Sequence, residues 1–266
     1  MNAIDLHPAE LAYALAYAKA DGVIGWEEAV FLPPAESSAD PADWFAEGEA
    51  RLLAAGRLVG ASEQGLSITD DMAAALLALA NPGLVLLAQR RSAEGVHTLT
   101  IHGAGRDLVG LRQRPDGLFE MTRYAELTAA VGACAGFVGA AQAPAAPASR
   151  LEASHAALAE IAERSATDPA EAAAALVALG AAAPAARSAA RAFAEPSAAG
   201  VVSVLYCAGN EVEDVESVTV LTTDEGESWS IVAPAGSEGP TILERSSVTA
   251  LTARIAVDIA ARLGAG

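Results

Sequence analysis

Apolar positions follow one order along the chain, and that order occurs twice. Each time, stretches with apolar residues every three to four positions come first and predict helices. Shorter alternating or continuous apolar runs follow, separated by turn-forming residues, and predict four strands. A last stretch with helical spacing closes each part. The pattern predicts an α+β fold for both parts of the chain.

In the first part, helices are expected at residues 8–20 and from Pro41 onward, where proline suits the first helical turn. A short strand is expected at 65–69, before a helix that Asn81-Pro82-Gly83 terminates. The strands and the closing helix are then expected at 84–91, 96–102, 107–113, 118–122 and 124–138.

In the second part, alanine-rich helices are expected at 151–164, 169–179 and 184–194. The strands are expected at 201–207, 217–223, 227–233 and 241–244, and the closing helix at 247–263. The run of alanine and proline at 140–149 suits an exposed linker between the two parts. We therefore expect an N-terminal subdomain at 1–139 and a C-terminal subdomain at 150–266.

The two strand–strand–strand–strand–helix blocks can be laid over each other. Residues 119–131 parallel residues 242–255, and Leu127-Thr-Ala matches Leu251-Thr-Ala after an offset of one residue. One interpretation is an internal duplication with a pseudo-twofold axis, and the other is two unrelated α+β units. We favour the duplication because the order and spacing of the elements agree.

The charge of the chain narrows its possible partners. Its 266 residues include 16 basic and 34 acidic side chains, a formal net charge of −18. A negative field of this strength repels phosphate backbones and anionic lipid headgroups, so we expect neither nucleic acid nor membrane as partner. The start of the chain lacks the pattern of a signal peptide, and no run is apolar enough to span a bilayer, so we expect a cytoplasmic location.

Residues that could carry catalysis or hold a metal do not form known motifs. His97 and His102 share an expected strand, but an odd separation puts them on opposite faces. Cys134 and Cys207 are too few for a disulfide framework and are expected to be buried free thiols. Gly103-Ala-Gly105 lacks the third glycine of a dinucleotide loop and reads as a hairpin turn. We expect a non-enzymatic protein without a cofactor or metal, although an enzyme whose site the sequence hides is a further alternative.

Charges of opposite sign gather on the corresponding strands of the two blocks. The first block carries Arg90, Arg91, Arg106, Arg112, Arg114 and Arg123, and the second carries Glu211, Glu213, Asp214, Glu216, Asp224, Glu225 and Glu227. Arg112 and Arg114 are expected to share one strand face, whereas Arg90 and Arg91 are expected to split between faces. Either these are solvated strand edges that discourage aggregation, or they form a polar docking surface that steers a partner.

Several stretches resemble the EspG family, proteins associated with type VII (ESX) secretion in actinobacteria. In the second part they are Gly200-Val-Val-Ser-Val204, residues 218–226, Trp229-Ser-Ile-Val232 and the expected helix at 251–263. In the first part they are Glu49-Ala-Arg-Leu-Leu53, the short strand and the leucine-rich helix before Asn81-Pro82. Gly226-Glu-Ser-Trp229 departs from the Gly-Arg-Tyr that the family often has at this point, and the basic residue is lost.

The resemblance implies a duplicated, quasi-twofold fold whose central antiparallel sheet is flanked by two helical bundles. It also implies a cytosolic chaperone that keeps helical clients of the PE/PPE type, or another ESX client, soluble for export. In the family, the loop between the second and third strands and the C-terminal helical bundle contact the client, and that loop corresponds here to 92–95. The candidate partner-binding residues are therefore Arg90, Arg91, Ser92, Glu94, Arg112 and Arg114. The alternative is a non-catalytic interaction or immunity-type protein of the same fold.

Overall fold

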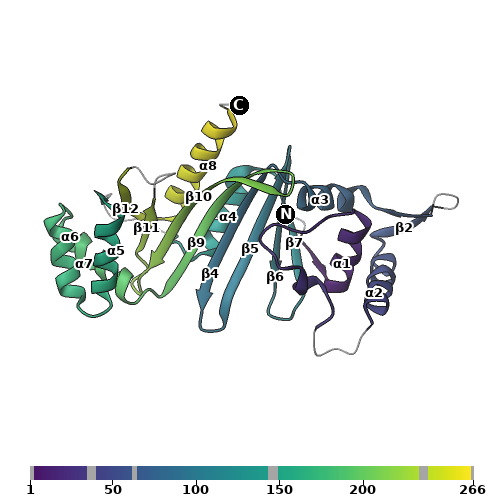
Figure 1. Cartoon of the computed structure of the whole chain (residues 1–266), viewed down its shortest axis with the longest axis horizontal. Helices are drawn as coiled ribbons and strands as arrows, with labels where there is room; N and C mark the ends of the chain where they lie inside the picture. The colour runs from purple at the N-terminus through teal and green to yellow at the C-terminus, as the bar shows by residue number, and fades with distance from the viewer. Residues whose placement is uncertain (1–2, 35–39, 62–64, 143–148, 234–238, 265–266) are drawn as a thin grey trace. The chain divides into compact units, whose positions relative to one another are not determined.

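The computed structural model describes residues 3–34, 40–61, 65–142, 149–233 and 239–264. Figure 1 shows the helices and strands of these residues along the chain. The helices are α1 (Pro8–Tyr17), η1 (Glu28–Phe31, a 3-10 turn), α2 (Pro41–Ala54), α3 (Asp70–Ala80), α4 (Leu127–Phe137), α5 (His155–Ser165), α6 (Pro169–Ala178), α7 (Ala183–Ala194) and α8 (Val248–Gly264).

The strands before α4 are β1 (Ala3–Leu6), β2 (Leu58–Ala61), β3 (Gly65–Ile68), β4 (Leu84–Ser92), β5 (Gly95–Ala104), β6 (Asp107–Gln113) and β7 (Phe119–Tyr124). Those after α4 are β8 (Arg150–Ala153), β9 (Ala198–Ala208), β10 (Glu211–Thr222), β11 (Ser228–Val232) and β12 (Thr241–Ser246). The expected α+β class is confirmed.

Ten strands form one sheet in the order β1-β7-β6-β5-β4-β9-β10-β11-β12-β8, and β2 pairs with β3 separately. The pairs β1/β7, β6/β7, β5/β6, β10/β11, β11/β12 and β12/β8 are antiparallel. Counted from either edge, a short opening strand comes first, followed by four later strands in reverse chain order. The two blocks therefore share one strand order, while their superposition and common origin stay predictions.

The chain forms two compact units that are not contiguous in sequence. Unit 1 comprises residues 1–85, 98–130 and 205–214, and unit 2 comprises 86–97, 131–204 and 215–266. Each unit thus takes residues from both sides of the expected boundary. Most of the expected linker, residues 143–148, lies outside the described residues, and the subdomains 1–139 and 150–266 stay a prediction.

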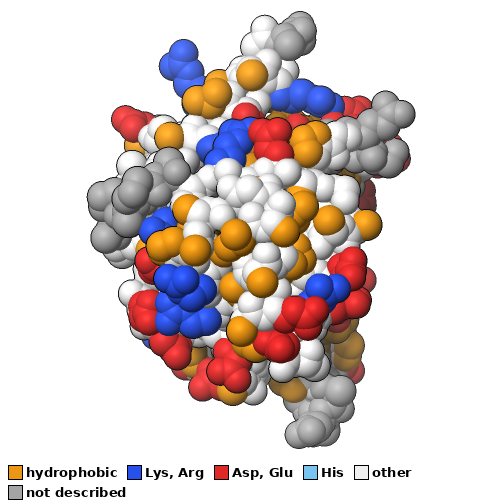
Figure 2. Space-filling model, turned by 90° about the vertical axis from the view of Figure 1, so that its left-hand side faces the viewer, with side chains coloured by type: hydrophobic (Ala, Val, Ile, Leu, Met, Phe, Trp, Pro, Cys, Tyr) orange, Lys and Arg blue, Asp and Glu red, His pale blue; other side chains and the backbone are white. Residues whose placement is uncertain are grey.

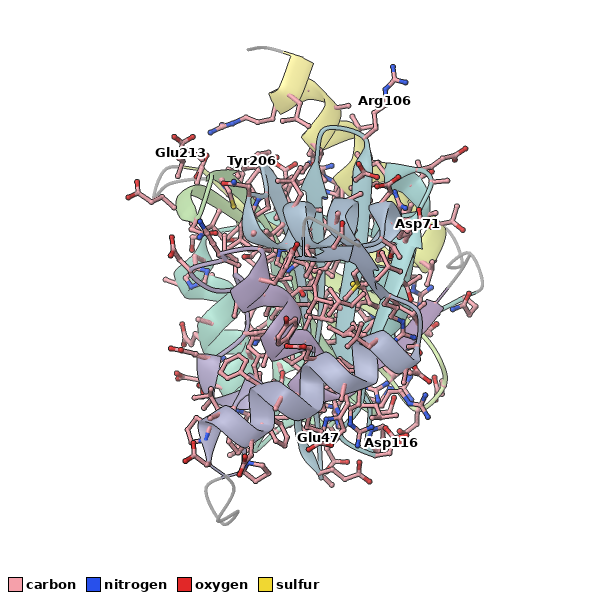
Figure 3. The ribbon with its side chains drawn as sticks, turned by 90° about the vertical axis from the view of Figure 1, so that its right-hand side faces the viewer. Glu47, Asp71, Arg106, Asp116, Tyr206 and Glu213 are labelled. Atoms are coloured by element: carbon pink, nitrogen blue, oxygen red, sulfur yellow. The ribbon has the colours of Figure 1, made fainter. Side chains whose placement is uncertain are left out.

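Unit 1 packs α1, α2 and α3 around a core that includes Leu6, Leu11, Leu52, Leu79 and Phe119. In Figure 3, α2 crosses in front of α1 and carries Glu47 on its outer side. His7 caps α1: its Nδ1 accepts from the backbone N–H of Ala9 at 3.2 Å, and its own N–H donates to Glu10 at 2.7 Å. This capping box and Pro8 explain why the helix begins where it does.

Unit 2 contains a bundle of α5, α6 and α7, seen grouped together in Figure 1. Its core joins Leu158, Ile161 and Leu176 with buried alanines, and Trp229 of β11 packs into it. Asp168 caps α6 by accepting from the N–H groups of Ala170 and Glu171 at 3.0 and 2.9 Å. Small side chains let these helices approach closely, as the alanine content predicts.

The sequence-based elements need three corrections. Residues 150–153 form strand β8, not the start of a helix, because Ser154 caps α5 by accepting from the N–H of Ala157. Strand β10 begins at Glu211, six residues before the expected Ser217, and pairs in register with β11 only from Val218 onward. Strands β1 and β2, of four residues each, are not predicted by the pattern of apolar positions.

Candidate partner-binding surfaces

The β4–β5 hairpin of unit 2 carries four of the sequence-predicted partner residues. Arg90 and Arg91 lie at the end of β4, where Arg90 is half-buried and Arg91 is exposed. Because they are neighbours on a strand, their side chains point to opposite faces. Ser92 braces the turn, since its Oγ accepts from the N–H of Glu94 at 3.1 Å and lies 2.8 Å from His97 Nε2. Within the described residues, neither arginine has an ion pair, so both guanidinium groups are available to a partner.

The other two candidates, Arg112 and Arg114, belong to unit 1 and are already paired. Arg112 lies 2.8 Å from Glu120 on the neighbouring strand. Arg114 lies 2.7 Å from Asp5 and 2.8 Å from Asp116, and the hydrogen bond that it donates to Asp5 is the main cause of its raised pKa. Arg114 directly follows β6, which ends at Gln113, and its N–H donates to the carbonyl oxygen of Leu118 at 2.8 Å, so the shared face of the two arginines stays a prediction.

Ion pairs also weaken the contrast between a basic and an acidic region. Arg123 pairs with Asp71 and Asp107 at 3.0 and 2.5 Å. Among the acidic residues, Glu225 pairs with Arg191 at 2.5 Å, which lowers the pKa of Glu225. In Figure 3, Arg106 and Glu213 extend outward from unit 1 at separate places. Many of these charged side chains therefore form local ion pairs or extend singly into solvent, and they do not form one basic and one acidic surface.

The groups most suited to chemistry lie inside the protein. His102 is fully buried, and burial lowers its pKa from 6.5 to about 3, so the imidazole is neutral. Its Nε2 lies 3.0 Å from Thr100 Oγ1, which also accepts from Trp26 Nε1 at 2.8 Å. Burial raises the pKa of the Cys134 thiol to about 12. Neither group can meet a substrate here, and the described residues contain no cluster of three or more metal-ligating side chains.

Helix α6 presents an apolar face that the sequence analysis did not single out. Ala170, Ala174, Val177 and Ala178 are all exposed and, by their spacing, lie along one side of the helix. We call these four residues the α6 face. The opposite side of α6 is buried by Ala172, Ala173 and Leu176. Apart from the exposed Glu171, the residues of α6 are apolar on both sides of the helix, and an exposed apolar side of this kind suits coverage by another molecule. The apolar composition of 169–178, interrupted by one glutamate, was the available signal.

Figure 2 shows the side of unit 2 that carries the α5–α7 bundle. Apolar side chains gather in the middle of this view, and charged side chains lie mainly around them. Arg164 is one of the charged groups of the bundle and pairs with Glu160 at 2.6 Å and with Glu171 at 3.2 Å. An apolar centre with a charged surround is the usual anatomy of a protein interface.

The arrangement of the sheet and helices has a counterpart among solved structures. The chain matches a structure of the Mycobacterium tuberculosis type VII secretion system chaperone EspG5, solved in complex with a PE25–PPE41 dimer. The match covers 95% of this chain and 94% of the other, with a TM-score of 0.66 and 13% sequence identity. The chain has the EspG5 fold. The resemblance expected from the sequence is thereby confirmed for the fold.

The EspG5 match rests on structure alone, because comparison of sequences finds no match. No protein-family model matches the chain, and no curated protein matches it. At 13% identity, packing and topology can persist while surface residues change freely. The EspG5 likeness therefore describes the fold, and any role of the α6 face and the β4–β5 hairpin depends on this chain's own residues. In the described parts of the chain, no helix is long and apolar enough to cross a membrane.

Proposed function

We propose that the chain is a chaperone-like binding protein of a type VII secretion system, which keeps a helical exported client soluble in the cytoplasm before export. One observation carries the proposal: the EspG5 fold extends over nearly the full length of both chains, and EspG5 was solved with a PE25–PPE41 dimer bound. A PE/PPE-type protein, or another helical client of the system, is the partner that this proposal implies.

The α6 face supplies a physical reason for a helical client. Three of its four residues are alanines, which let a partner helix approach closely along the groove between ridges. Val177, with 44% of its surface exposed, is the largest apolar group on the face. Covering such a surface removes apolar area from water on both molecules and so hides the part of the client that would aggregate.

The β4–β5 hairpin can add orientation to this binding. Arg90 and Arg91 lie in the same compact unit as α6 and have no carboxylate partner among the described residues. Exposed charges at an interface affect the rate of encounter and the choice of partner more than the final affinity. We assign the apolar face to affinity and the two arginines to steering. On this proposal the protein acts by binding, without a catalytic step or a cofactor.

The proposal can be tested with matched valine variants. The full chain is co-expressed with the PE–PPE pair of the same organism, and soluble complex and affinity are measured for wild type, Val177→Glu and Val257→Glu. Val257 of α8 is 65% exposed and lies outside the α6 face, so it controls for adding a carboxylate. Val177→Glu should weaken binding at least tenfold, or about 1.4 kcal/mol, because the charge is desolvated in the complex.

The control variant should bind like the wild type, and both variants should keep the wild-type thermal unfolding. Equal losses for Val177→Glu and Val257→Glu would contradict the role of the α6 face. A stable complex with a toxin, together with no binding to the PE–PPE pair, would favour the immunity-type alternative instead.

A further inference from the structure

Unit 1 carries two adjoining hollows that the proposed function does not use. The larger has a volume of about 480 Å3 and lies among α1, the segment 20–26, η1 and Phe45. The smaller has a volume of about 290 Å3 and lies between the end of α1 and α3. Ala20, Asp21 and Asn210 line both, so the two hollows meet at these residues. We call the pair the α1 groove.

Large apolar side chains line the α1 groove while open to solvent. Leu32 in the larger hollow is 41% exposed, and Tyr17 and Leu77 in the smaller are 46% and 59% exposed. A single exposed apolar residue is ordinary on a protein surface. Three along one continuous depression, above a floor that includes the buried Phe31, form the type of surface that a partner covers.

Hydrogen bonds hold the walls of the groove in place. Trp26 Nε1 donates to Thr100 Oγ1 at 2.8 Å, and Trp44 Nε1 donates to the carbonyl oxygen of Phe31 at 3.0 Å. Tyr17 Oη donates to the carbonyl oxygen of Leu66 at 2.9 Å. Aromatic groups fixed in this way lose little freedom when a partner binds, so the surface is organised in advance.

The charges of the groove restrict what can bind there. The charged residues that line the larger hollow are Asp21 and Glu28, both exposed carboxylates, with no basic residue beside them. The smaller hollow has Lys19 and Asp21. A partner that buries apolar groups here gains from positive charge close to Asp21 and Glu28 and loses from negative charge.

We propose that the α1 groove binds an amphipathic segment of another protein, with one apolar side chain in each hollow and Lys or Arg facing Asp21 and Glu28. Two hollows that meet along a shared wall suit successive anchors on one helical face better than a single small molecule. The groove lies wholly in unit 1, whereas the α6 face belongs to unit 2. The inference therefore adds a second partner surface to the proposed function.

The first test uses designed peptides and the full chain. Three fluorescent peptides of about 18 residues are compared by anisotropy at about 0.15 M salt: an amphipathic Leu/Lys helix, its Leu/Glu counterpart, and a Leu/Lys peptide with the same composition in shuffled order. The ordered Leu/Lys peptide should bind at least tenfold more tightly than either of the others. Equal binding of the two Leu/Lys peptides would overturn the proposal, because it would show attraction to net charge alone.

The second test places the peptide in the groove. Asp21→Lys with Glu28→Lys should weaken binding of the Leu/Lys helix at least tenfold and strengthen binding of the Leu/Glu helix. The matched control is Glu163→Lys with Asp224→Lys, two exposed carboxylates of unit 2 for which the structure gives no ion pair; it changes the net charge equally. The control should change affinity less than twofold, and equal effects of the two double variants would overturn the proposal.

A third variant removes the space without changing the charge. Ala16 is exposed on α1 and lines the larger hollow, so Ala16→Trp should fill it and reduce peptide binding at least tenfold. Thermal unfolding like that of the wild type shows that the variant is folded. Full peptide binding by Ala16→Trp would overturn the proposal. Self-association of the wild type that Asp21→Lys with Glu28→Lys abolishes, without peptide binding, would assign the groove to a second copy of the chain and overturn it too.

Discussion

His102 shows how a single buried side chain sets a limit on the stability of unit 1. The imidazole is enclosed, its Nε2 faces Thr100 Oγ1, and its Nδ1 has no hydrogen-bond partner among the described residues. Protonation would place a positive charge in this enclosed site without a counter-charge. Folding therefore requires the neutral form, which is why burial lowers the pKa to about 3.

This histidine predicts a loss of stability in mild acid. Its pKa is 6.5 when unfolded and about 3 when folded, so the unfolded chain binds the proton first as the pH falls. The stabilisation is complete above pH 6.5 and declines down to about pH 3, by about 1.36 kcal/mol per pH unit. Between pH 7 and pH 5 the wild type should lose roughly 2 kcal/mol of unfolding free energy from this group.

Urea unfolding at pH 7, 6 and 5 measures this loss, and His102→Gln is the comparison because glutamine does not titrate. The variant is expected to be less stable than the wild type at pH 7, so the informative quantity is the slope with pH. The slope should become shallower in His102→Gln. Equal slopes in both proteins would show that His102 does not titrate with unfolding.

At the scale of residues, the sequence could suggest which strand face a side chain occupies, but not which distant residue it contacts. The odd spacing of His97 and His102 predicted opposite strand faces, but it carried no information on burial, which covers every position from Leu99 to Gly103. It could not show that Arg114 would pair with Asp5, because 109 residues separate them and only the β1/β7 pairing brings them together. The same limit hid Trp26 and Thr100, which lie 74 residues apart. The six candidate partner residues remain predictions.

At the scale of elements, the crossing of α1 and α2 depends on one glycine. An added Cβ at Gly48 would lie 2.1 Å from the carbonyl oxygen of Ala9 and 3.0 Å from the Cβ of Tyr13. Both neighbours belong to the backbone or the stem of a side chain, so neither can turn away. The two helices can approach this closely because α2 has no side chain at Gly48.

Gly48→Ala should therefore separate the helices and lower the free energy of unfolding by about 1–3 kcal/mol. Gly136→Ala is the matched control, because Gly136 is also helical and an added Cβ there meets nothing within 4 Å. That control should raise stability by about 0.5–1 kcal/mol. Equilibrium unfolding of both variants measures the difference, and a Gly48→Ala protein as stable as the wild type would contradict the close contact.

Long elements were predicted from the sequence better than short ones. The period of apolar residues located α3, α6, α7 and α8 to within a few residues of their ends, and Pro41 located the start of α2. Strand β8 was misread because Leu151 fits a helix and a strand equally over four residues, although Ser154 was a visible capping signal. The start of β10 escaped because Glu211 to Glu216 are mostly polar and exposed, and lack the apolar alternation that marks a half-buried strand.

At the scale of the whole molecule, hydrogen bonds within each unit join residues from the two halves of the sequence. In unit 1, the N–H of Cys207 donates to the carbonyl oxygen of Gly83 at 3.1 Å. In unit 2, Thr222 Oγ1 donates to the carbonyl oxygen of Gly139 at 2.7 Å, and the N–H of Ala141 donates to Ser228 Oγ at 2.7 Å. Each unit therefore needs residues from both sides of the 140–149 segment.

Cutting the chain within that segment should then disable both halves. Residues 1–142 and 149–266, expressed separately, are expected to lack cooperative thermal unfolding, whereas co-expression should restore a stable complex. Circular dichroism and calorimetry of each fragment and of the mixture provide the comparison. A fragment that unfolds cooperatively on its own would contradict this prediction and show that its half of the sequence folds independently. The spacing of elements along the sequence could not predict that each unit contains residues from both halves, because strand pairing between distant segments forms only in the folded sheet.

Lys19 is the single lysine of this sequence and lines the smaller hollow of the α1 groove. Its φ of 54° holds it in the left-handed region after α1, and the side chain is exposed. Any reagent or enzyme that modifies lysine amines therefore has one side chain to act on, and that side chain borders a proposed binding surface. Immobilising the protein through its lysine would attach it by this site and obstruct the groove. Acetylation or ubiquitin transfer at the lysine would act at the same place, beside the proposed binding surface.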